Sequence, residues 1–198
     1  MAVTNVLRIT YASIAQPREA RGGTAKYSCG FLIPKDDEAT INWFKARIQE
    51  AVNAGIKKGK FTAVGVKSPK FNNPFKDGDA YYEEALPEQQ AGRECYRGHY
   101  FITASSINAP GTVDRFAKPV SPEEFYSGCY CRGDLGFFPY NNESFGVGCA
   151  LNHIMFVKDG ERMDGRSTAE SAFSAFAEKE ESAGALWDET TGSEDQLL

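Results

Sequence analysis

The chain has 198 residues and a mass of 21.8 kDa, with 22 Lys plus Arg, 27 Asp plus Glu and a formal net charge of -5. A hydrophobic fraction of 41% and a charged fraction of 25% exclude wholesale disorder and a collagen-like repeat, and the length favours one domain. No apolar run reaches the roughly 18 residues that a membrane span needs, and residues 1–5 lack a signal-peptide pattern, so we expect a cytoplasmic protein.

The first third of the chain predicts a hairpin followed by a helix. Residues 6–11 alternate as a strand does, and 25–33 form a second such run after a glycine-containing break. Residues 34–38 then supply an acidic helix start, and apolar side chains recur at three- and four-residue steps beyond it. We therefore expect an amphipathic helix that ends near Gly55.

Residues 56–95 show no sustained period, and so long a stretch inside a domain is typical of a functional or mobile loop. A strand over 96–105 and two long strands over about 126–138 and 145–157 follow. Five or more strands with one inserted helix predict a mainly β domain of the α+β type. Its antiparallel strands are expected to close into a small barrel, because closure removes exposed strand edges.

The C-terminal part of the chain differs from the rest in charge. Residues 167–177 predict a short terminal helix, and 178–198 contain seven acidic residues and one lysine. Residues 1–177 are left with 20 acidic and 21 basic residues and are close to neutral. The pattern predicts a folded domain over 1–177 and a flexible acidic interaction segment over 178–198, which we call the tail.

Alternation along the strands separates an inner from an outer face. In 126–138 the odd positions, from Cys129 to Phe137, suit the interior, and the even positions include Tyr130 and Arg132. Outward cations and aromatic rings together suit single-stranded nucleic acid, because cations follow phosphates and rings stack on unpaired bases. An ordinary solvated face is the alternative interpretation.

The basic loop over 57–76 supports the same interpretation, because it combines Lys67 and Lys70 with Phe71. A plain surface loop whose phenylalanines return to the core is the alternative.

The cysteines predict reduced, buried thiols, because four of the five lie in strand-like runs. A metal site is the rival interpretation, since Cys129, Cys131, Cys149 and His153 share the inward parity. The thiols of Cys-x-Cys in an extended strand lie roughly 7 Å apart and lack the turn of C-x-x-C zinc sites. We therefore favour small core residues.

Motifs for catalysis are absent from the sequence: it contains no P-loop, G-x-G-x-x-G, H-E-x-x-H or G-x-S-x-G. The acidic residues Asp77, Asp79 and Glu83 suit a hard cation in type, but their spacing does not complete a calcium loop. We expect a non-enzyme with no catalytic residue, no metal and no cofactor. A metal-dependent nuclease that uses these three carboxylates stays open as an alternative.

Three stretches, taken together and in order, resemble a known family. They are Gly98-His99-Tyr100-Phe101-Ile102-Thr103-Ala104-Ser105 leading to 111–115, then 124–132, then 146–152 with 159–161. The set is similar to the tailed-phage and prophage family of single-stranded DNA-binding proteins with an oligonucleotide-binding (OB) fold, and the likeness covers most of residues 6–175. It implies an OB-like five-stranded barrel, and a non-catalytic phage protein that coats and protects single strands in replication and recombination in the bacterial host cytoplasm.

The resemblance and the outer-face pattern together give the expected DNA-binding residues, which are Lys26, Lys67, Lys70, Phe71, Arg97, Phe101, Arg115, Lys118, Tyr130 and Arg132. Proteins of this function often carry an acidic tail that competes with DNA and recruits a DNA polymerase, a helicase or recombination proteins. The corresponding tail residues are Trp187, Asp188, Glu189, Glu194, Asp195, Leu197 and Leu198. The final leucines replace the aromatic residue of such tails, which leaves the partner open.

Two questions stay open at this stage. The sequence does not show an oligomeric state, and a homo-oligomer is compatible with it. A phage structural or assembly protein that makes only protein contacts is the main alternative function.

Overall fold

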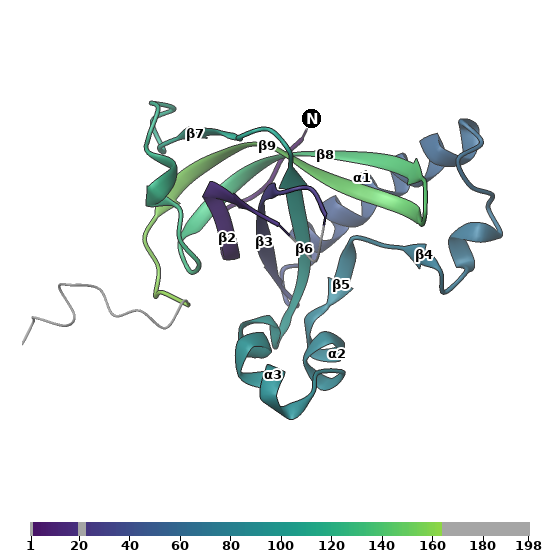
Figure 1. The fold of residues 1–198 in the computed structure, drawn as a ribbon, viewed down its shortest axis with the longest axis horizontal. Helices are drawn as coiled ribbons and strands as arrows, with labels where there is room; N and C mark the ends of the chain where they lie inside the picture. The colour runs from purple at the N-terminus through teal and green to yellow at the C-terminus, as the bar shows by residue number, and fades with distance from the viewer. Residues whose placement is uncertain (1, 20–22, 164–198) are drawn as a thin grey trace, which may run out of the picture. The chain divides into compact units, whose positions relative to one another are not determined.

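The computed structural model describes residues 2–19 and 23–163. Five long strands form its barrel (Figure 1): β2 (Leu7–Arg18), β3 (Lys26–Pro34), β6 (His99–Ser106), β8 (Tyr130–Asn141) and β9 (Phe145–Lys158). Around the ring the order is β2-β3-β6-β9-β8, and β8 pairs with β2 to close it. Counted along the chain, this order is first, second, third, fifth, fourth, the connectivity of an OB barrel. The expected mainly β barrel is confirmed, but three α-helices lie between the strands where one was expected, and one joint of the ring is parallel.

The five strand pairings that close the ring differ in the number of residue pairs in register. Four are antiparallel, and β3 with β6 and β8 with β9 pair over most of their lengths. The joint between β6 and β9 is parallel and is registered by one pair, Ser105 with Ala150. This joint therefore has the shortest register of the five.

The helix α1 (Glu38–Lys57) begins where the acidic residues predict and ends two residues beyond Gly55. The Asp37 carboxylate caps it by accepting a hydrogen bond from the Thr40 amide at 3.0 Å. Its apolar face packs against β8, where the Phe44 ring meets Phe137 edge to face at 6.3 Å. The periodicity of the sequence thus identified both the helix and its buried face.

Short elements fill the region that the sequence predicts as a long loop. They are η1 (Gly65–Lys67), β4 (Phe71–Asn72), β5 (Phe75–Asp77), α2 (Gly78–Glu83), α3 (Pro87–Arg93) and η2 (Glu94–Tyr96). β4 pairs with β9 and β5 with β6, so this region is attached to the barrel at two places. β1 (Ala2–Val3) pairs with β8, β7 (Gly111–Val113) pairs with β9, and η3 (Pro122–Glu124) precedes β8. Each piece is too short for a periodic pattern to show.

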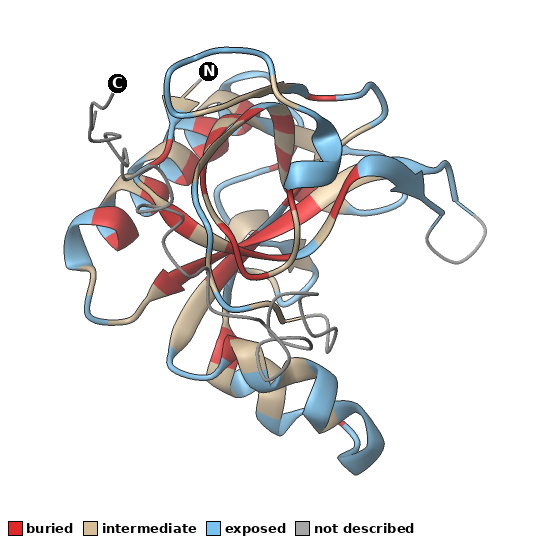
Figure 2. Ribbon diagram, turned by 90° about the vertical axis from the view of Figure 1, so that its left-hand side faces the viewer, coloured by how far each residue is buried: buried red, intermediate tan, exposed pale blue. Residues whose placement is uncertain are grey.

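The core fills the barrel and the space beneath α1, as the buried segments in Figure 2 show. The predicted interior positions of β8 up to Leu135 are buried, and Phe137 is half-buried. Cys29, Cys129, Cys131 and Cys149 are free and buried, as expected. No helix in the described ranges is both long and apolar enough for a membrane span.

Two details of the cysteine and histidine prediction are wrong. The register of β8 on β9 shifts after Asp134, which leaves Asn152 as an extra residue; this bulge reverses the alternation, so that His153 is exposed and Ile154 is buried. The Cys129 and Cys131 Sγ atoms lie 3.5 Å apart instead of roughly 7 Å, because Cys129 follows Gly128 (φ 119°) and precedes the strand. No group of metal-ligating side chains occurs within 2–19 and 23–163.

The expected terminal helix over 167–177 and the tail lie outside the described residues.

Candidate nucleic-acid groove

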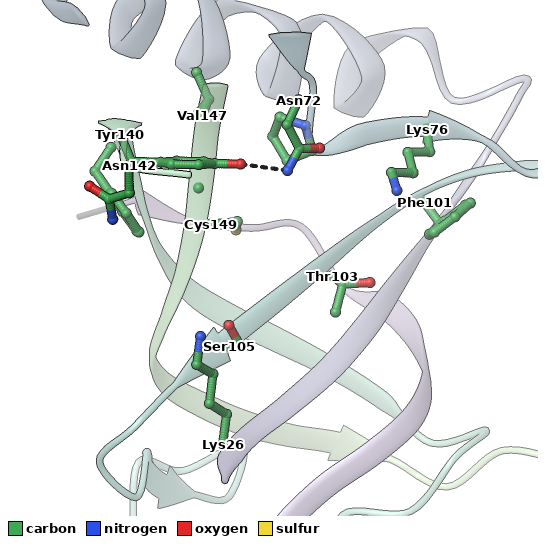
Figure 3. Close-up of a pocket in the computed structure, with 13 residues that line it drawn as sticks. Lys26, Asn72, Lys76, Phe101, Thr103, Ser105, Tyr140, Asn142, Val147 and Cys149 are labelled. Atoms are coloured by element: carbon green, nitrogen blue, oxygen red, sulfur yellow. Dashed lines mark hydrogen bonds between the residues drawn. The ribbon is translucent and has the colours of Figure 1, made fainter. Parts of the chain in front are cut away.

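A groove of about 490 Å³ lies beside β3 and β6, between the β8–β9 hairpin and the β4–β5 segment (Figure 3). Thirteen residues line it: Lys26, Asn72, Pro74, Lys76, Phe101, Thr103, Ser105, Phe138, Tyr140, Asn142, Val147, Gly148 and Cys149. Ile102 and Ala104 of β6 enter the core, and the alternating positions Phe101, Thr103 and Ser105 therefore face the groove.

Two aromatic side chains of β8 form one wall of the groove. Phe138 is 48% exposed, and a Cβ atom at its cross-strand partner Gly148 would come within 2.5 Å of its Cζ atom. Because Gly148 has no side chain, the Phe138 ring can lie against the backbone at that position. The Tyr140 hydroxyl accepts a hydrogen bond from Asn72 Nδ2 at 2.6 Å, which fixes the second ring (Figure 3).

Lysines supply the charge around the groove. Lys26 extends from β3 toward Ser105, and Lys76 lies near Phe101 on the opposite side (Figure 3). Lys76 ends a segment, 57–76, that contains six lysines and no acidic residue. The segment is held against the β8–β9 hairpin, because Asn141 Nδ2 donates to the Lys60 carbonyl at 2.6 Å and β4 pairs with β9. None of these lysines forms an ion pair within the described part of the chain, so their charge is available to an anion.

The groove brings together two of the ten predicted DNA-binding residues, Lys26 and Phe101. Phe101 is only 5% exposed, because its ring packs against Tyr96 at 4.4 Å and it belongs to a small cluster with Leu32. It is therefore part of the groove floor. Phe71 packs against Phe61 at 5.3 Å.

The remaining predicted residues are spread over the barrel surface. Lys67 and Lys70 are exposed on the lysine segment, and Arg115 and Lys118 are exposed after β7. Arg97 forms an ion pair with Glu94 at 2.8 Å. The Tyr130 ring lies 4.6 Å from Lys158 Nζ, and Arg132 Nη1 donates to the Thr4 carbonyl at 3.0 Å.

Sequence reasoning missed Phe138 and Tyr140 as site residues, although they share the even positions of β8 with Tyr130 and Arg132. Phe138 is the last even position of the expected strand, and extending the alternation by one step past its end would have found Tyr140 as well.

Asp77 and Asp79, two of the three carboxylates of the nuclease alternative, form ion pairs with Lys35. Lys35 Nζ lies 2.7 Å from Asp77 Oδ1 and 2.7 Å from Asp79 Oδ2, and Asp79 Oδ1 also accepts from the Gly98 amide at 2.7 Å. The hydrogen bonds from Lys35 lower the pKa of both carboxyl groups, and the same bonds raise the pKa of Lys35. A lysine between the two carboxylates supplies the positive charge that a metal would bring, so the cluster has the form of a structural ion-pair network.

Solved structures with a similar fold come from phages. The single-stranded DNA-binding protein from bacteriophage Enc34, in complex with ssDNA, matches with a TM-score of 0.63 and 24% identity over 81% of this chain and 88% of that chain. The single-stranded DNA-binding protein gp2.5 of bacteriophage T7 matches with a TM-score of 0.55 and 16% identity over 84% and 97%. At these identities the likeness shows the fold.

Sequence comparison extends the relationship. A protein named p50 from Acyrthosiphon pisum secondary endosymbiont phage 1 is 29% identical over 172 residues, which are 83% of this chain and 87% of the relative. The family model described as Enterobacter phage Enc34, ssDNA-binding protein, matches residues 1–184. The chain therefore belongs to the Enc34 ssDNA-binding protein family.

Proposed function

We propose that this protein binds single-stranded DNA in the groove, with Phe138 and Tyr140 stacking on bases and with Lys26 and Lys76 near phosphates. The observation that carries this proposal is the half-exposed Phe138 ring, which lies over Gly148 and lines the same groove as lysines that pair with no carboxylate of residues 2–19 and 23–163. Membership of the Enc34 family supports it. Base stacking is worth about 1 to 3 kcal/mol per base and tolerates every sequence, which suits a protein that coats a strand.

The proposed role is the protection of single strands during phage DNA replication and recombination in the bacterial host cytoplasm, without a catalytic step. The Lys35 network supports a non-catalytic role, because it engages Asp77 and Asp79, two of the three carboxylates that the nuclease alternative would use. Homo-oligomerisation is compatible with this role.

The tail is proposed to compete with DNA for the groove. Its seven acidic residues carry the same sign of charge as DNA and would contend for the lysines of the groove. A DNA polymerase, a helicase or a recombination protein that captures the tail would then free the groove for DNA.

Fluorescence anisotropy of a labelled oligo-dT tests the groove. Phe138→Ala should weaken binding by about 1 to 3 kcal/mol. Lys26→Ala and Lys76→Ala should each reduce the slope of log K against log salt by roughly 0.7. Lys45→Ala, an exposed lysine of α1 outside the groove, is the matched control.

Tyr130→Ala compares the two surfaces directly. Full affinity in Phe138→Ala together with a loss in Tyr130→Ala would move the site to the opposite part of β8. No binding of oligo-dT by the wild-type protein at low salt would instead favour a structural protein with protein contacts only.

A comparison of the full chain with residues 1–177 tests the tail, and the deletion leaves every residue of the described barrel in the chain. The shortened protein should bind single strands more tightly, most clearly at low salt, and should gain affinity for a duplex control. Equal affinities at low salt would remove the competitor role.

A further inference from the structure

Phe116 is the most exposed aromatic side chain among the large hydrophobic residues on the described surface, at 66%. It lies in the turn that follows β7, which we call the Phe116 turn (residues 114–118). An aromatic ring left this open to water suits contact with another molecule better than packing within the fold.

The backbone holds the Phe116 turn in one shape. The Asp114 carboxylate accepts hydrogen bonds from the Phe116 and Lys118 amides at 2.8 and 2.9 Å, and the Asp114 amide donates to the Lys118 carbonyl at 2.8 Å. Ala117 has a φ of 60°, a conformation that residues other than glycine and asparagine rarely adopt. The ring is thus presented on a built turn, which lowers the entropy lost on binding.

The charge of the turn favours a polyanion. The Arg115 guanidinium lies 4.8 Å from the centroid of the Phe116 ring. Lys118, two residues after Phe116 in the sequence, is exposed. Neither cation forms an ion pair within residues 2–19 and 23–163, and the single carboxylate, Asp114, is engaged by backbone amides. An exposed ring flanked in sequence by two cations, one of them over the ring, lacks the contiguous apolar area of a protein-docking surface, and it has the elements that stack on a base and contact its phosphates.

The turn lies beyond the far end of the groove. β7 pairs with β9 at His153–Met155, whereas the groove meets β9 at Val147, Gly148 and Cys149. The six residue steps from Gly148 to Ile154 correspond to roughly 20 Å of extended strand. Figure 1 shows β7 and the chain after it at the opposite end of β9 from the β8–β9 hairpin tip.

We infer that the Phe116 turn is a second DNA contact, separate from the groove, in which Phe116 stacks on a base of a strand long enough to reach it. This inference rests on the proposed function, since the same single strand occupies both contacts. The two points together set the length of DNA that one molecule covers.

Binding of oligo-dT of increasing length, from about 4 to about 16 nucleotides, tests the inference on the full chain. Phe116→Ala should leave the affinity for the shortest oligonucleotides unchanged and should lower the affinity for the longest by roughly 5-fold or more. Leu86→Ala removes an apolar side chain of 56% exposure elsewhere on the surface and should change neither.

Two further substitutions separate stacking from general apolar contact. Phe116→Trp should retain the affinity for long strands, and the added tryptophan emission should be quenched by long strands and not by short ones, relative to the wild-type protein. Phe116→Leu keeps an apolar side chain without a flat ring and should behave as Phe116→Ala does.

The outcomes are distinguishable. Wild-type protein that binds no oligonucleotide removes the proposed function and the inference with it. Wild-type binding with no effect of Phe116→Ala at any length overturns the inference alone. A loss at all lengths would place Phe116 in the same contact as the groove, and full affinity in Phe116→Leu would show that no base stacks there.

Discussion

At the scale of single residues, the shape of the groove depends on Gly148, which has no side chain. A Cβ atom at Gly148 would lie 2.5 Å from the Cζ atom of Phe138, and the nearest atoms all belong to that exposed ring. The ring can move away at small cost in stability, but it would then leave the position from which we propose that it stacks.

Gly148→Ala should therefore reduce the affinity for oligo-dT by up to about 3 kcal/mol and change the melting temperature little. Gly136→Ala is the matched control, because a Cβ there would meet its nearest neighbours, on Ala150 and Asn152, at 3.6 Å, an ordinary contact. Anisotropy titrations and thermal unfolding of both variants check this. A large fall in melting temperature without a change in affinity would show that Gly148 serves the fold alone.

At the scale of elements, the Lys35 network joins β3 to β5 and to the start of α2. Asp77 also caps α2 by accepting from the Asp79 amide at 2.9 Å. The lowered pKa values of Asp77 and Asp79 mean that their stabilising effect is complete above their ordinary value of 3.8 and is lost as the pH falls through the lower folded values. The raised pKa of Lys35 means that its effect is complete below 10.5 and is lost as the pH rises through the higher folded value.

Lys35→Met should accordingly lower the melting temperature most between about pH 4 and pH 10, and the difference from wild type should shrink in stronger acid. Lys45→Met on the exposed side of α1 provides the control, with no pH-dependent difference expected. Thermal unfolding followed by circular dichroism across this pH range is the measurement. A difference that is constant from pH 3 to pH 7 would mean that Lys35 acts through its cation–π contact with Tyr100 and not through the two carboxylates.

Sequence reasoning found the long elements and missed the places where their pattern breaks. The helix and the five long strands follow from periodicity. β2 runs to Arg18 instead of ending at 11, because its register shifts after Thr10, near Tyr11 (φ 48°), and the alternation restarts. The groove was found only in part, since it draws residues from six strands and two loops, and barrel closure, which no local pattern records, brings them together.

At the scale of the whole molecule, the buried thiols report on the integrity of the barrel. Burial raises the pKa of Cys29, and it raises the pKa of Cys149 to about 12. Both belong to the same continuous core as Cys129 and Cys131, and only Cys95 is partly accessible. Thiolate is the reactive form, so burial and charge state both protect Cys29 and Cys149, whereas the hydrogen bond with Cys131 lowers the pKa of Cys129 and leaves burial as its protection.

Native protein treated with N-ethylmaleimide at pH 8 should therefore gain at most one adduct, on Cys95, and all five cysteines should react after denaturation. Intact-mass spectrometry over time checks this, and peptide mapping locates the first adduct. Rapid addition of two or more groups to native protein would show that the core opens locally.

The single rung between β6 and β9 has a consequence for recognition. Ser105 belongs to that rung and also lines the groove, so the floor of the groove lies on the joint with the shortest register. The walls, in contrast, are held together by the β4–β9 pairing and by the hydrogen bond between Asn72 and Tyr140. A floor tied by one ladder pair would place no rigid limit on the width of a base, which suits purines and pyrimidines alike.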